Sequence, residues 1–347
     1  MFASEKGGTM DAGKRVVGVE IPVIDIGALV ASGNDSAVAD IATSIRAACL
    51  GSGFFYLANA GISADVVAGA LDANRRFHAL PIEEKIKLKR NTWHRGYVPV
   101  GGNISTSSQR FEAARLPNQI ESFNARHEVD AAHPDYKVKA LQGPNQWPED
   151  PTFKRAFQRY DSAVRDLGLR LLHPVAVAVG ERKDFFDSFF SPPSTNLRMM
   201  HYPPSPPARP EDMFGIHPHT DYGFLTILTQ DGVGGLQVQR PDGSWIDAPQ
   251  IPDTFVVNVG DMLARWTNDG FNSTPHRVIS PPESVDRYSM AMFFDPNVDA
   301  HISCLPQFVG SDESPKYAPI RYGDYYSMRL DTNFQRVGTS AALQAAG

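Results

Sequence analysis

The stretch Gly215-Ile-His-Pro-His-Thr-Asp-Tyr-Gly-Phe-Leu-Thr226 places two histidines and an aspartate within five residues. Side chains two residues apart on an extended chain point to the same face, so His219 and Asp221 are expected to lie together there. His217 shares this face if the strand runs straight through Pro218. A polar turn in solvent is the alternative, because a His-x-Asp pair is common by chance. The stretch therefore predicts a metal site only if a third ligand comes from elsewhere in the chain.

The residues around this stretch favour β structure. From about residue 195, short apolar runs such as 224–228, 254–258 and 288–294 alternate with turn signals. The Asp-Gly pair at 242–243 suits a tight hairpin. Several antiparallel strands in succession predict a sandwich or jelly roll, with the earlier helices packed outside it.

The first half of the chain predicts helices and a few short strands. Runs 21–26 and 53–57 have the composition of strands, and apolar residues at helical spacing follow residues 36 and 63. A long helix should begin at Asp150-Pro151, because proline suits the first helical position. Pro174 lies inside this helix, so we expect a kink or break near His173. Residues 95–145 are polar and irregular, and we expect loops there.

A third candidate ligand lies in the β-rich half. His276 follows Asp221 by 55 residues and lies within residues 273–279, which also have the pattern of a strand. Two imidazoles and one carboxylate on neighbouring strands form a facial triad that suits non-haem Fe(II), because three coordination positions stay open. Zinc is the alternative metal, although the chain has no His-Glu-x-x-His spacing of the zinc peptidases.

A candidate carboxylate anchor follows the last of these ligands. Arg287-Tyr-Ser289 begins eleven residues after His276, and its arginine and serine alternate onto one face of a predicted strand. The planar guanidinium matches a carboxylate, and the serine hydroxyl adds another donor beside it. An isolated Arg-x-Ser is usually a surface strand, but its position after the metal ligands favours a binding role.

The order His-x-Asp, distal histidine and Arg-x-Ser resembles the Fe(II)/2-oxoglutarate-dependent oxygenases, and within them the isopenicillin N synthase-like family. Tyr202-Pro-Pro-Ser-Pro206 is similar to the family's Tyr-Pro-Pro-Cys-Pro motif. The family's barrel motifs are matched at 219–221, 260–261 and 276–278, and its N-terminal motifs at 21–25, 53–56, 80–85 and 95–97. The resemblance implies an α+β fold, with a double-stranded β-helix (jelly-roll) core and a helical N-terminal cap.

The same resemblance divides the chain into four parts. Residues 1–17 are expected to form a disordered N-terminus, and residues 18–194 the helical cap region with the first strands. Residues 195–332 are expected to form the jelly-roll oxygenase core, and residues 333–347 a C-terminal tail.

The resemblance also implies roles for individual residues. The iron ligands are His219, Asp221 and His276. His217 is expected to be an exposed histidine at a strand edge, and a donor that supports the ligands is the alternative. Arg287 and Ser289 hold the distal carboxylate of 2-oxoglutarate, and the Tyr202 hydroxyl is a third contact. Many plant relatives carry asparagine two positions before this tyrosine, where this chain has Met200. Phe293 is a candidate for stacking on the substrate, with a plain core phenylalanine as the alternative.

The implied activity is oxidation of a small organic substrate by O2, coupled to decarboxylation of 2-oxoglutarate to succinate. Hydroxylation, desaturation and ring closure all fit, and ascorbate is a candidate reductant. One alternative is an isopenicillin N synthase-type oxidase, in which Arg-x-Ser holds a substrate carboxylate and 2-oxoglutarate is not used. A jelly roll that binds a metal or ligand without catalysis and a metallohydrolase are the others, and the hydrolase lacks an identifiable general base.

Composition restricts the partners and the compartment. The formal net charge is −6 and basic residues form no run, which argues against nucleic acid or an anionic membrane as the main partner. The two cysteines, Cys49 and Cys304, cannot form a disulfide framework, and the polar N-terminus lacks the apolar core of a signal peptide. We therefore expect a cytoplasmic protein.

Overall fold

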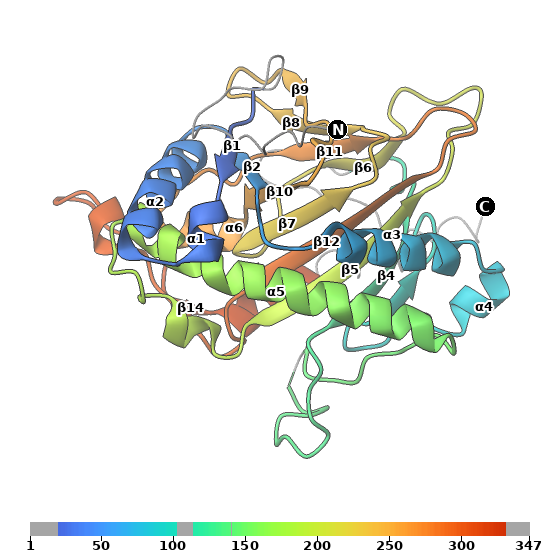
Figure 1. The fold of residues 1–347 in the computed structure, drawn as a ribbon, viewed down its shortest axis with the longest axis horizontal. Helices are drawn as coiled ribbons and strands as arrows, with labels where there is room; N and C mark the ends of the chain where they lie inside the picture. Colours follow the sequence, from blue (N-terminus) through green and yellow to red (C-terminus); the bar gives the residue numbers. More distant parts are fainter. Residues whose placement is uncertain (1–19, 103–113, 140, 331–347) are drawn as a thin grey trace, which may run out of the picture.

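Two β-sheets face each other, and helices cover the outer face of the larger sheet (Figure 1). The computed structural model describes residues 20–102, 114–139 and 141–330. The expected N-terminus (1–17) and C-terminal tail (333–347) lie outside these residues. The arrangement confirms the predicted α+β fold with a jelly-roll core.

The larger sheet, called the main sheet, has eight strands. In spatial order they are β1 (Val23–Asp25), β2 (Phe54–Ala58), β10 (Thr254–Val259), β7 (Leu225–Gln230), β12 (Arg287–Asp295), β5 (Ser194–Tyr202), β4 (Glu121–Arg126) and β3 (Gly96–Val98). Strands from both halves of the sequence therefore share one sheet, and the parallel β1–β2 pair is its one departure from antiparallel pairing among the described residues.

The smaller sheet, called the minor sheet, has four antiparallel strands. They are β6 (Phe214–His219), β11 (His276–Ile279), β8 (Leu236–Gln239) and β9 (Trp245–Asp247) in spatial order. Two short strands, β13 (His301–Ile302) and β14 (Ile320–Arg321), pair separately.

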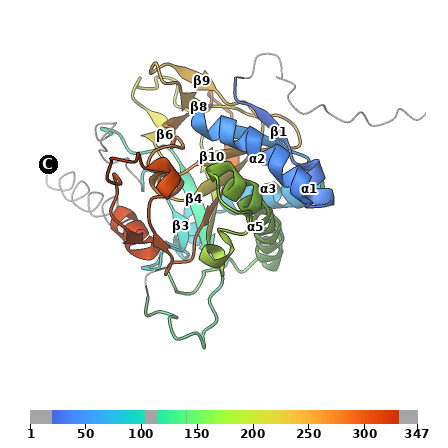
Figure 2. The same cartoon turned by 90° about the vertical axis from the view of Figure 1, so that its left-hand side faces the viewer.

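The helices lie mainly in the first half of the chain. They are α1 (Gly27–Ala31), α2 (Asp35–Leu50), α3 (Ala64–His78), α4 (Ile82–Ile86), α5 (Pro151–Val179) and α6 (Asp261–Trp266), with 3-10 turns η1 (Asp187–Phe190) and η2 (Pro306–Phe308). Residues 322–330 are also helical and are called the C-terminal helix. It lies across the molecule from α1, α2 and α5 (Figure 2). No helix among the described residues is long and apolar enough to cross a membrane.

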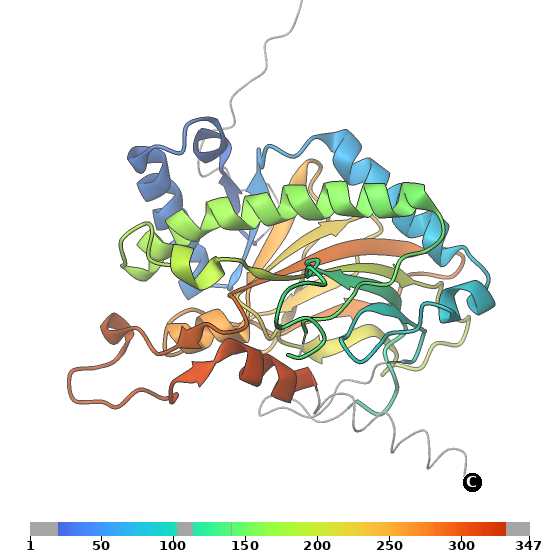
Figure 3. The same cartoon turned by 90° about the horizontal axis from the view of Figure 1, so that it is seen from below.

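Local sequence signals explain where the long helices begin and end. The Asn34 side chain accepts a hydrogen bond from the Ala37 amide and caps α2. Asp150 caps α5 in the same way, and the helix ends at Gly180, which adopts a left-handed conformation with φ of 92°. The helix does not break near His173, because α5 continues through Pro174 to Val179 (Figure 3), and a kink there stays a prediction.

The two faces of the main sheet differ in character. On β5, the outward Leu197 and Met199 join the large apolar cluster beneath α2, α3 and α5. The alternate residues Arg198 and Met200 face the minor sheet, because successive side chains of a strand point to opposite faces. The apolar cluster on that inner face is smaller. The outer face therefore anchors the helices, and the inner face carries the polar side chains of the site.

Two strands in the region expected to form loops were missed, β3 and β4. β4 lies within residues 95–145 and pairs with β5 along its whole length. Its sequence does alternate, with Phe123 and Ala125 on the apolar outer face and Ser122, Asn124 and Arg126 on the inner face. The prediction of loops was wrong there because the inner-facing residues are polar, although all of them are buried.

A buried polar network joins β4 and β5 to α4. Glu121 on β4 is paired with His201 on β5, and the His201 Nδ1 atom lies 2.7 Å from the Glu121 Oε1 atom. Lys85 donates to both oxygens of Glu121 at 2.8 and 3.1 Å, and the Tyr97 hydroxyl donates as well. Burial acts to raise the pKa of Glu121, but the hydrogen bonds from His201, Lys85 and Tyr97 outweigh it and lower the pKa to about 2.

We predict that Glu121→Ala lowers the free energy of unfolding by about 3–5 kcal/mol, because it leaves the Lys85 ammonium buried without its carboxylate. Urea denaturation of the purified protein measures the change. The exposed pair between Glu84 and Lys87 is the control, and Glu84→Ala should have a much smaller effect. Equal stability of Glu121→Ala and wild type would show that the buried pair does not hold β4 in place.

Candidate metal centre

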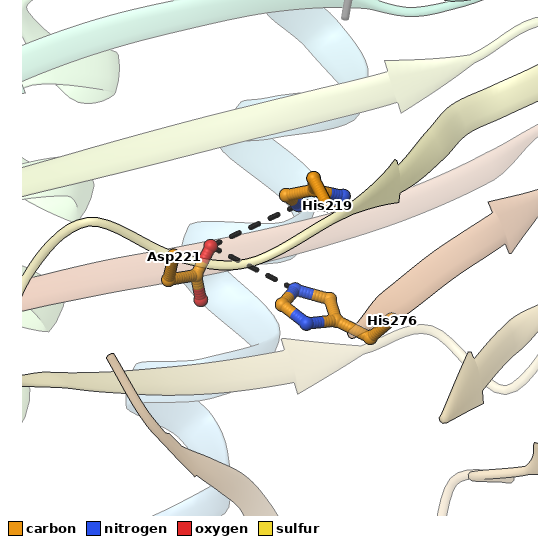
Figure 4. Close-up of side chains that lie close together, drawn as sticks. All are labelled: His219, Asp221 and His276. Carbon is orange, nitrogen blue, oxygen red and sulfur yellow. Dashed lines mark ion pairs between the residues drawn. The ribbon is translucent and has the colours of Figure 1, made fainter. Parts of the chain in front are cut away.

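His219, Asp221 and His276 converge between the two sheets (Figure 4). His219 is the last residue of β6, His276 is the first residue of β11, and the two are register partners. Asp221 lies in the loop that leads from β6 to the main sheet. One candidate ligand atom from each residue lies within 4.8 Å of the other two. The Asp221 Oδ1 atom is 3.8 Å from the His219 Nε2 atom and 3.7 Å from the His276 Nε2 atom.

Backbone carbonyls fix which ring nitrogen of each histidine is free. The His219 Nδ1 atom lies 2.8 Å from the carbonyl oxygen of His217, and the His276 Nδ1 atom lies 3.1 Å from that of Thr274. A carbonyl only accepts hydrogen bonds, so Nδ1 carries the proton in both rings. The Nε2 lone pairs are then available to a metal, and both face Asp221.

The carboxylate of Asp221 is held in the same directed way. Its Oδ2 atom accepts hydrogen bonds from the Thr226 hydroxyl at 2.5 Å and from the Asn258 side-chain amide at 2.8 Å. Its Oδ1 atom faces the two imidazoles. Thr226 on β7 and Asn258 on β10 were missed in the sequence, because only the register of the main sheet brings them to Asp221.

The three side chains influence one another's protonation. Burial and the neighbouring His276 lower the pKa of His219 to about 4. Burial acts to raise the pKa of Asp221, but the two imidazoles and the hydrogen bonds from Thr226 and Asn258 outweigh it, so the pKa is lowered. His219 is therefore neutral and Asp221 ionised at neutral pH, which is the protonation that metal binding needs.

The loop that follows Asp221 is clamped by its neighbours. The carbonyl of Asp221 accepts from the Asp261 amide at 2.7 Å, and the Phe224 amide donates to the Asp295 carboxylate at 2.8 Å. Gly223 has no room for a side chain, because a Cβ atom there would lie 1.9 Å from the Asp295 Oδ1 atom. The backbone thus sets the position of Asp221 before any metal arrives.

These residues fit a divalent metal with open coordination positions. Metal bonds to imidazole and carboxylate of about 2.1 Å place ligands at right angles roughly 3 Å apart. The observed separations of 3.7 and 3.8 Å therefore need to contract by less than about 1 Å. Among the described residues, no other group of histidine, cysteine, aspartate and glutamate side chains has metal-ligand spacing.

The expectation that His217 is an exposed histidine was wrong. Its side chain is buried, with Nδ1 2.7 Å from the Asn118 side-chain oxygen and Nε2 3.1 Å from the Asp212 carbonyl. The bulge between β6 and β11 changes the register, so His217 does not point to the same side as His219. Its carbonyl, not its ring, contributes to the candidate centre.

Arg287 and its partners form a second polar group at the far end of β12. The guanidinium donates to the Gly234 carbonyl, to the Gln230 side-chain oxygen at 3.0 Å and to the Ser289 hydroxyl at 3.4 Å. A guanidinium has five N–H donors, so two remain for a bound carboxylate. The Tyr202 ring lies 4.5 Å from the Arg287 Cζ atom. The sequence did not indicate Gln230, which holds the arginine from β7.

Met200 lies beside Tyr202 in this group. The Tyr202 hydroxyl is 3.5 Å from the Met200 sulfur, a weak acceptor. Met200 is buried and is the register partner of Ser289. The methionine therefore puts an apolar side chain next to the candidate carboxylate site.

A row of inner-face side chains crosses the main sheet at the level of Asp221. They are register partners on five adjacent strands: Asn258, Thr226, Phe293, Asn196 and Arg126. Phe293 lies in the middle of this row and is only partly buried. That position suits a contact with substrate, which stays a prediction.

Comparisons with known proteins agree with this geometry. The profile of the 2OG-Fe(II) oxygenase superfamily matches residues 193–296, and that of the N-terminal region of non-haem dioxygenases in morphine synthesis matches residues 21–150. A 2-oxoglutarate-Fe(II) type oxidoreductase of Emericella nidulans is 34% identical over 87% of both chains. A homoarginine-6-hydroxylase of Arabidopsis thaliana is 32% identical over 90% of this chain and 97% of its own.

A solved structure extends the similarity to the fold. A full-length Neurospora crassa protein, crystallised in complex with alpha-KG and thymine, superposes with a TM-score of 0.79 and 31% identity. The match covers 93% of this chain and 99% of the Neurospora protein. The 2-oxoglutarate in the first relative's name and the alpha-KG bound to the Neurospora protein support the dioxygenase over the oxidase alternative.

We predict that Thr226→Val and Asn258→Leu each weaken Fe(II) binding by about 10–100-fold, because each removes a hydrogen bond that orients Asp221. Anaerobic Fe(II) titration measures the affinity, with His276→Ala as the reference for complete loss. Thr229→Val is the matched control, since Thr229 lies on β7 but bonds Tyr160 on the outer face. Wild-type affinity in both variants would refute the role of these contacts.

We also predict that Arg287→Ala raises the dissociation constant of 2-oxoglutarate by tens-fold or more, with Fe(II) binding little changed. The buried carboxylate would lose its charged partner, a loss on the order of 2–5 kcal/mol. Arg287→Lys should recover only part of the affinity, because an ammonium lacks the planar fork. Titration of 2-oxoglutarate into the Fe(II)-loaded variants tests this, and unchanged affinity in Arg287→Ala would place the cosubstrate elsewhere.

Proposed function

Because the chain belongs to the 2OG-Fe(II) oxygenase superfamily, and so couples oxidation of a small substrate to turnover of 2-oxoglutarate, we propose that its substrate is a small organic acid. Fe(II) with 2-oxoglutarate and O2 supplies the oxidant for a C–H bond and yields succinate and CO2. The proposal is based on Arg198. Its guanidinium lies beside the candidate metal centre and has no carboxylate partner among the described residues.

We assign the cofactor contacts by geometry. His219, Asp221 and His276 would hold Fe(II) through Nε2, Oδ1 and Nε2. Arg287 and Ser289 would bind the distal carboxylate of 2-oxoglutarate, beside the Tyr202 hydroxyl. These groups neutralise the cosubstrate and orient it toward the metal, so that the substrate needs only to be placed beside them.

Arg198 lies between the two groups. On the inner face of the main sheet it follows Asn196 of the metal row and precedes Met200 beside the cosubstrate site. Its electrostatic neighbours include Asp221, His219 and Tyr202. Among the described residues its guanidinium makes one hydrogen bond, from Nε to the Ser122 hydroxyl at 3.0 Å. Its terminal nitrogens therefore have no acceptor within the described part of the chain and can bind one on a substrate.

A second arginine strengthens the positive potential around Arg198. Arg126 lies on β4, the neighbouring strand, and is buried. Of the acidic groups close to these two arginines, Asp221 faces the metal site, and burial raises the pKa of Asp295 to about 6. With this pKa Asp295 is mostly ionised at neutral pH and offsets the charge of Arg126, whereas Arg198 has no carboxylate partner among the described residues.

The cofactors do not remove this excess of positive charge. The formal charges of Fe(II), the Asp221 carboxylate, dianionic 2-oxoglutarate and Arg287 sum to zero. Arg198 is outside that sum, and a charge that is partly shielded from water is costly unless it is paired. An anionic substrate supplies the missing partner.

The same charges discriminate among the substrate types of relatives. The Arabidopsis relative is named for homoarginine, an amino acid that has a basic side chain as well as a carboxylate, and the Neurospora protein was crystallised with uncharged thymine. A basic group needs a free carboxylate beside the metal, and the described residues supply none. An uncharged ring would leave the guanidinium of Arg198 without a counter-charge. A carboxylate satisfies both its charge and its donors.

We predict that small carboxylic acids bind to the Fe(II)–2-oxoglutarate form in preference to their primary amides. The probes are benzoate, phenylacetate and hexanoate with benzamide, phenylacetamide and hexanamide, which match the acids in shape but lack the charge. The change in the iron–cosubstrate absorption band under anaerobic conditions measures binding. Succinate formation in air, with and without each probe, measures whether the probe stimulates turnover.

Arg198→Gln tests the assignment of the anchor. It should weaken binding of the best acid by tens-fold, because a charge-assisted contact is replaced by a neutral one, and leave the amide little affected. Arg240→Gln is the control, since Arg240 lies on the surface and pairs with Glu20. Equal binding of acids and amides, or stimulation by thymine alone, would overturn the proposed substrate class.

A further inference from the structure

The C-terminal helix packs beside the candidate metal centre, against the residue that follows Asp221. Its Tyr326 is buried and lies with the ring centroid 6.5 Å from that of Tyr222, the residue that follows Asp221. The Arg329 Cζ atom lies 4.1 Å from the Tyr222 ring centroid, and its guanidinium is 3.1 Å from the Asp261 carboxylate. The helix is thus attached to the loop that carries a candidate iron ligand.

Tyr326 also contacts Arg126 of β4. The Arg126 Nη2 atom donates to the Tyr326 hydroxyl at 3.2 Å, and the Arg126 Cζ atom lies 5.1 Å from the Tyr326 ring centroid. These contacts join residues 200 positions apart in the sequence. The guanidinium lies over the ring face, an arrangement favoured by the negative potential there. The hydroxyl and the ring of Tyr326 therefore set the position and the orientation of the Arg126 guanidinium.

Arg126 keeps a buried donor that nothing in the described residues satisfies. Its side chain is 4% exposed, and its Nε atom has no hydrogen-bond partner there. Buried polar groups are usually hydrogen-bonded, and an unpaired one in a native structure calls for an explanation such as a missing ligand. A bound acceptor at this position removes the deficit.

The register of β4 and β5 puts Arg126 within reach of Arg198. Arg126 pairs with Asn196, and Asn124 pairs with Arg198, so the two arginines are diagonal neighbours on the inner face. Diagonal neighbours are about 7–8 Å apart, a distance that long side chains span. Two guanidinium groups can therefore contact one carboxylate from two sides.

We propose that Tyr326 is a positioning residue that orients Arg126, and that Arg126 is the second of two arginines that bind the substrate's carboxylate. The C-terminal helix is then a determinant of acid specificity. The inference rests on the proposed function, because it takes the substrate to be an acid held by Arg198. It adds a second anchor and the element that orients it. Tyr326 itself touches the arginine and acts on the substrate through it.

The test uses the Fe(II)–2-oxoglutarate form of the full chain and the best-bound acid among benzoate, phenylacetate and hexanoate. Tyr326→Phe keeps the ring and removes the hydroxyl. It should raise the dissociation constant of that acid about three- to tenfold, the effect of one hydrogen bond. Binding of the matching amide, Fe(II) affinity and 2-oxoglutarate affinity should stay at wild-type values. Tyr325→Phe is the matched control, because it removes another tyrosine–arginine hydrogen bond from the same helix.

A double-mutant cycle separates positioning from a general structural role. If Tyr326 acts through Arg126, the double variant Tyr326→Phe/Arg126→Gln binds the acid no more weakly than Arg126→Gln alone. Additive losses, or equal losses for acid and amide, would overturn the inference and leave the acid substrate standing. If wild type itself shows no preference for acids over amides, the proposed function fails, and this inference fails with it.

Discussion

The rest of the site depends on the contacts of the Asp221 carboxylate, because these contacts join the two sheets. One oxygen is held by Thr226 and Asn258 of the main sheet. The other faces His219 and His276, which the minor sheet carries. A buried carboxylate needs partners on every side, so the sheets are fixed at the separation that brings these four residues to it. The cosubstrate and substrate positions follow from that point.

The inner face of the main sheet is polar at the expense of stability. The outer face of β4 and β5 packs Phe123, Leu197 and Met199 beneath the helices, as a sheet in a stable core should. The inner face buries Arg126 and keeps Arg198 beside it, where an apolar pair would pack without loss. Such an arrangement is retained where ligands supply the missing partners, which is why departures from simple core packing gather at functional sites.

The sequence predicted the candidate ligands better than their surroundings. His219 and Asp221 are two residues apart, and a family motif covers His276, so local pattern was sufficient. Thr226 and Asn258 could not be found in this way, because their role depends on strand register. β4 was missed because buried polar residues were taken as signs of a loop. His217 was misjudged because a bulge in β6 changed the register, and its ring is buried against Asn118 and Asp212.

The backbone carbonyls that hold the two imidazoles have a thermodynamic consequence. Each carbonyl fixes the proton on Nδ1, and the third ligand, Asp221, is ionised well below neutral pH. His219, whose pKa is lowered, and Asp221 therefore release no proton to a metal at neutral pH. Metal sites generally release protons on loading, and their affinity then changes with pH. Here two of the three ligands contribute nothing to this linkage near neutrality, which makes iron loading less sensitive to acidity than in a site whose ligands all carry protons.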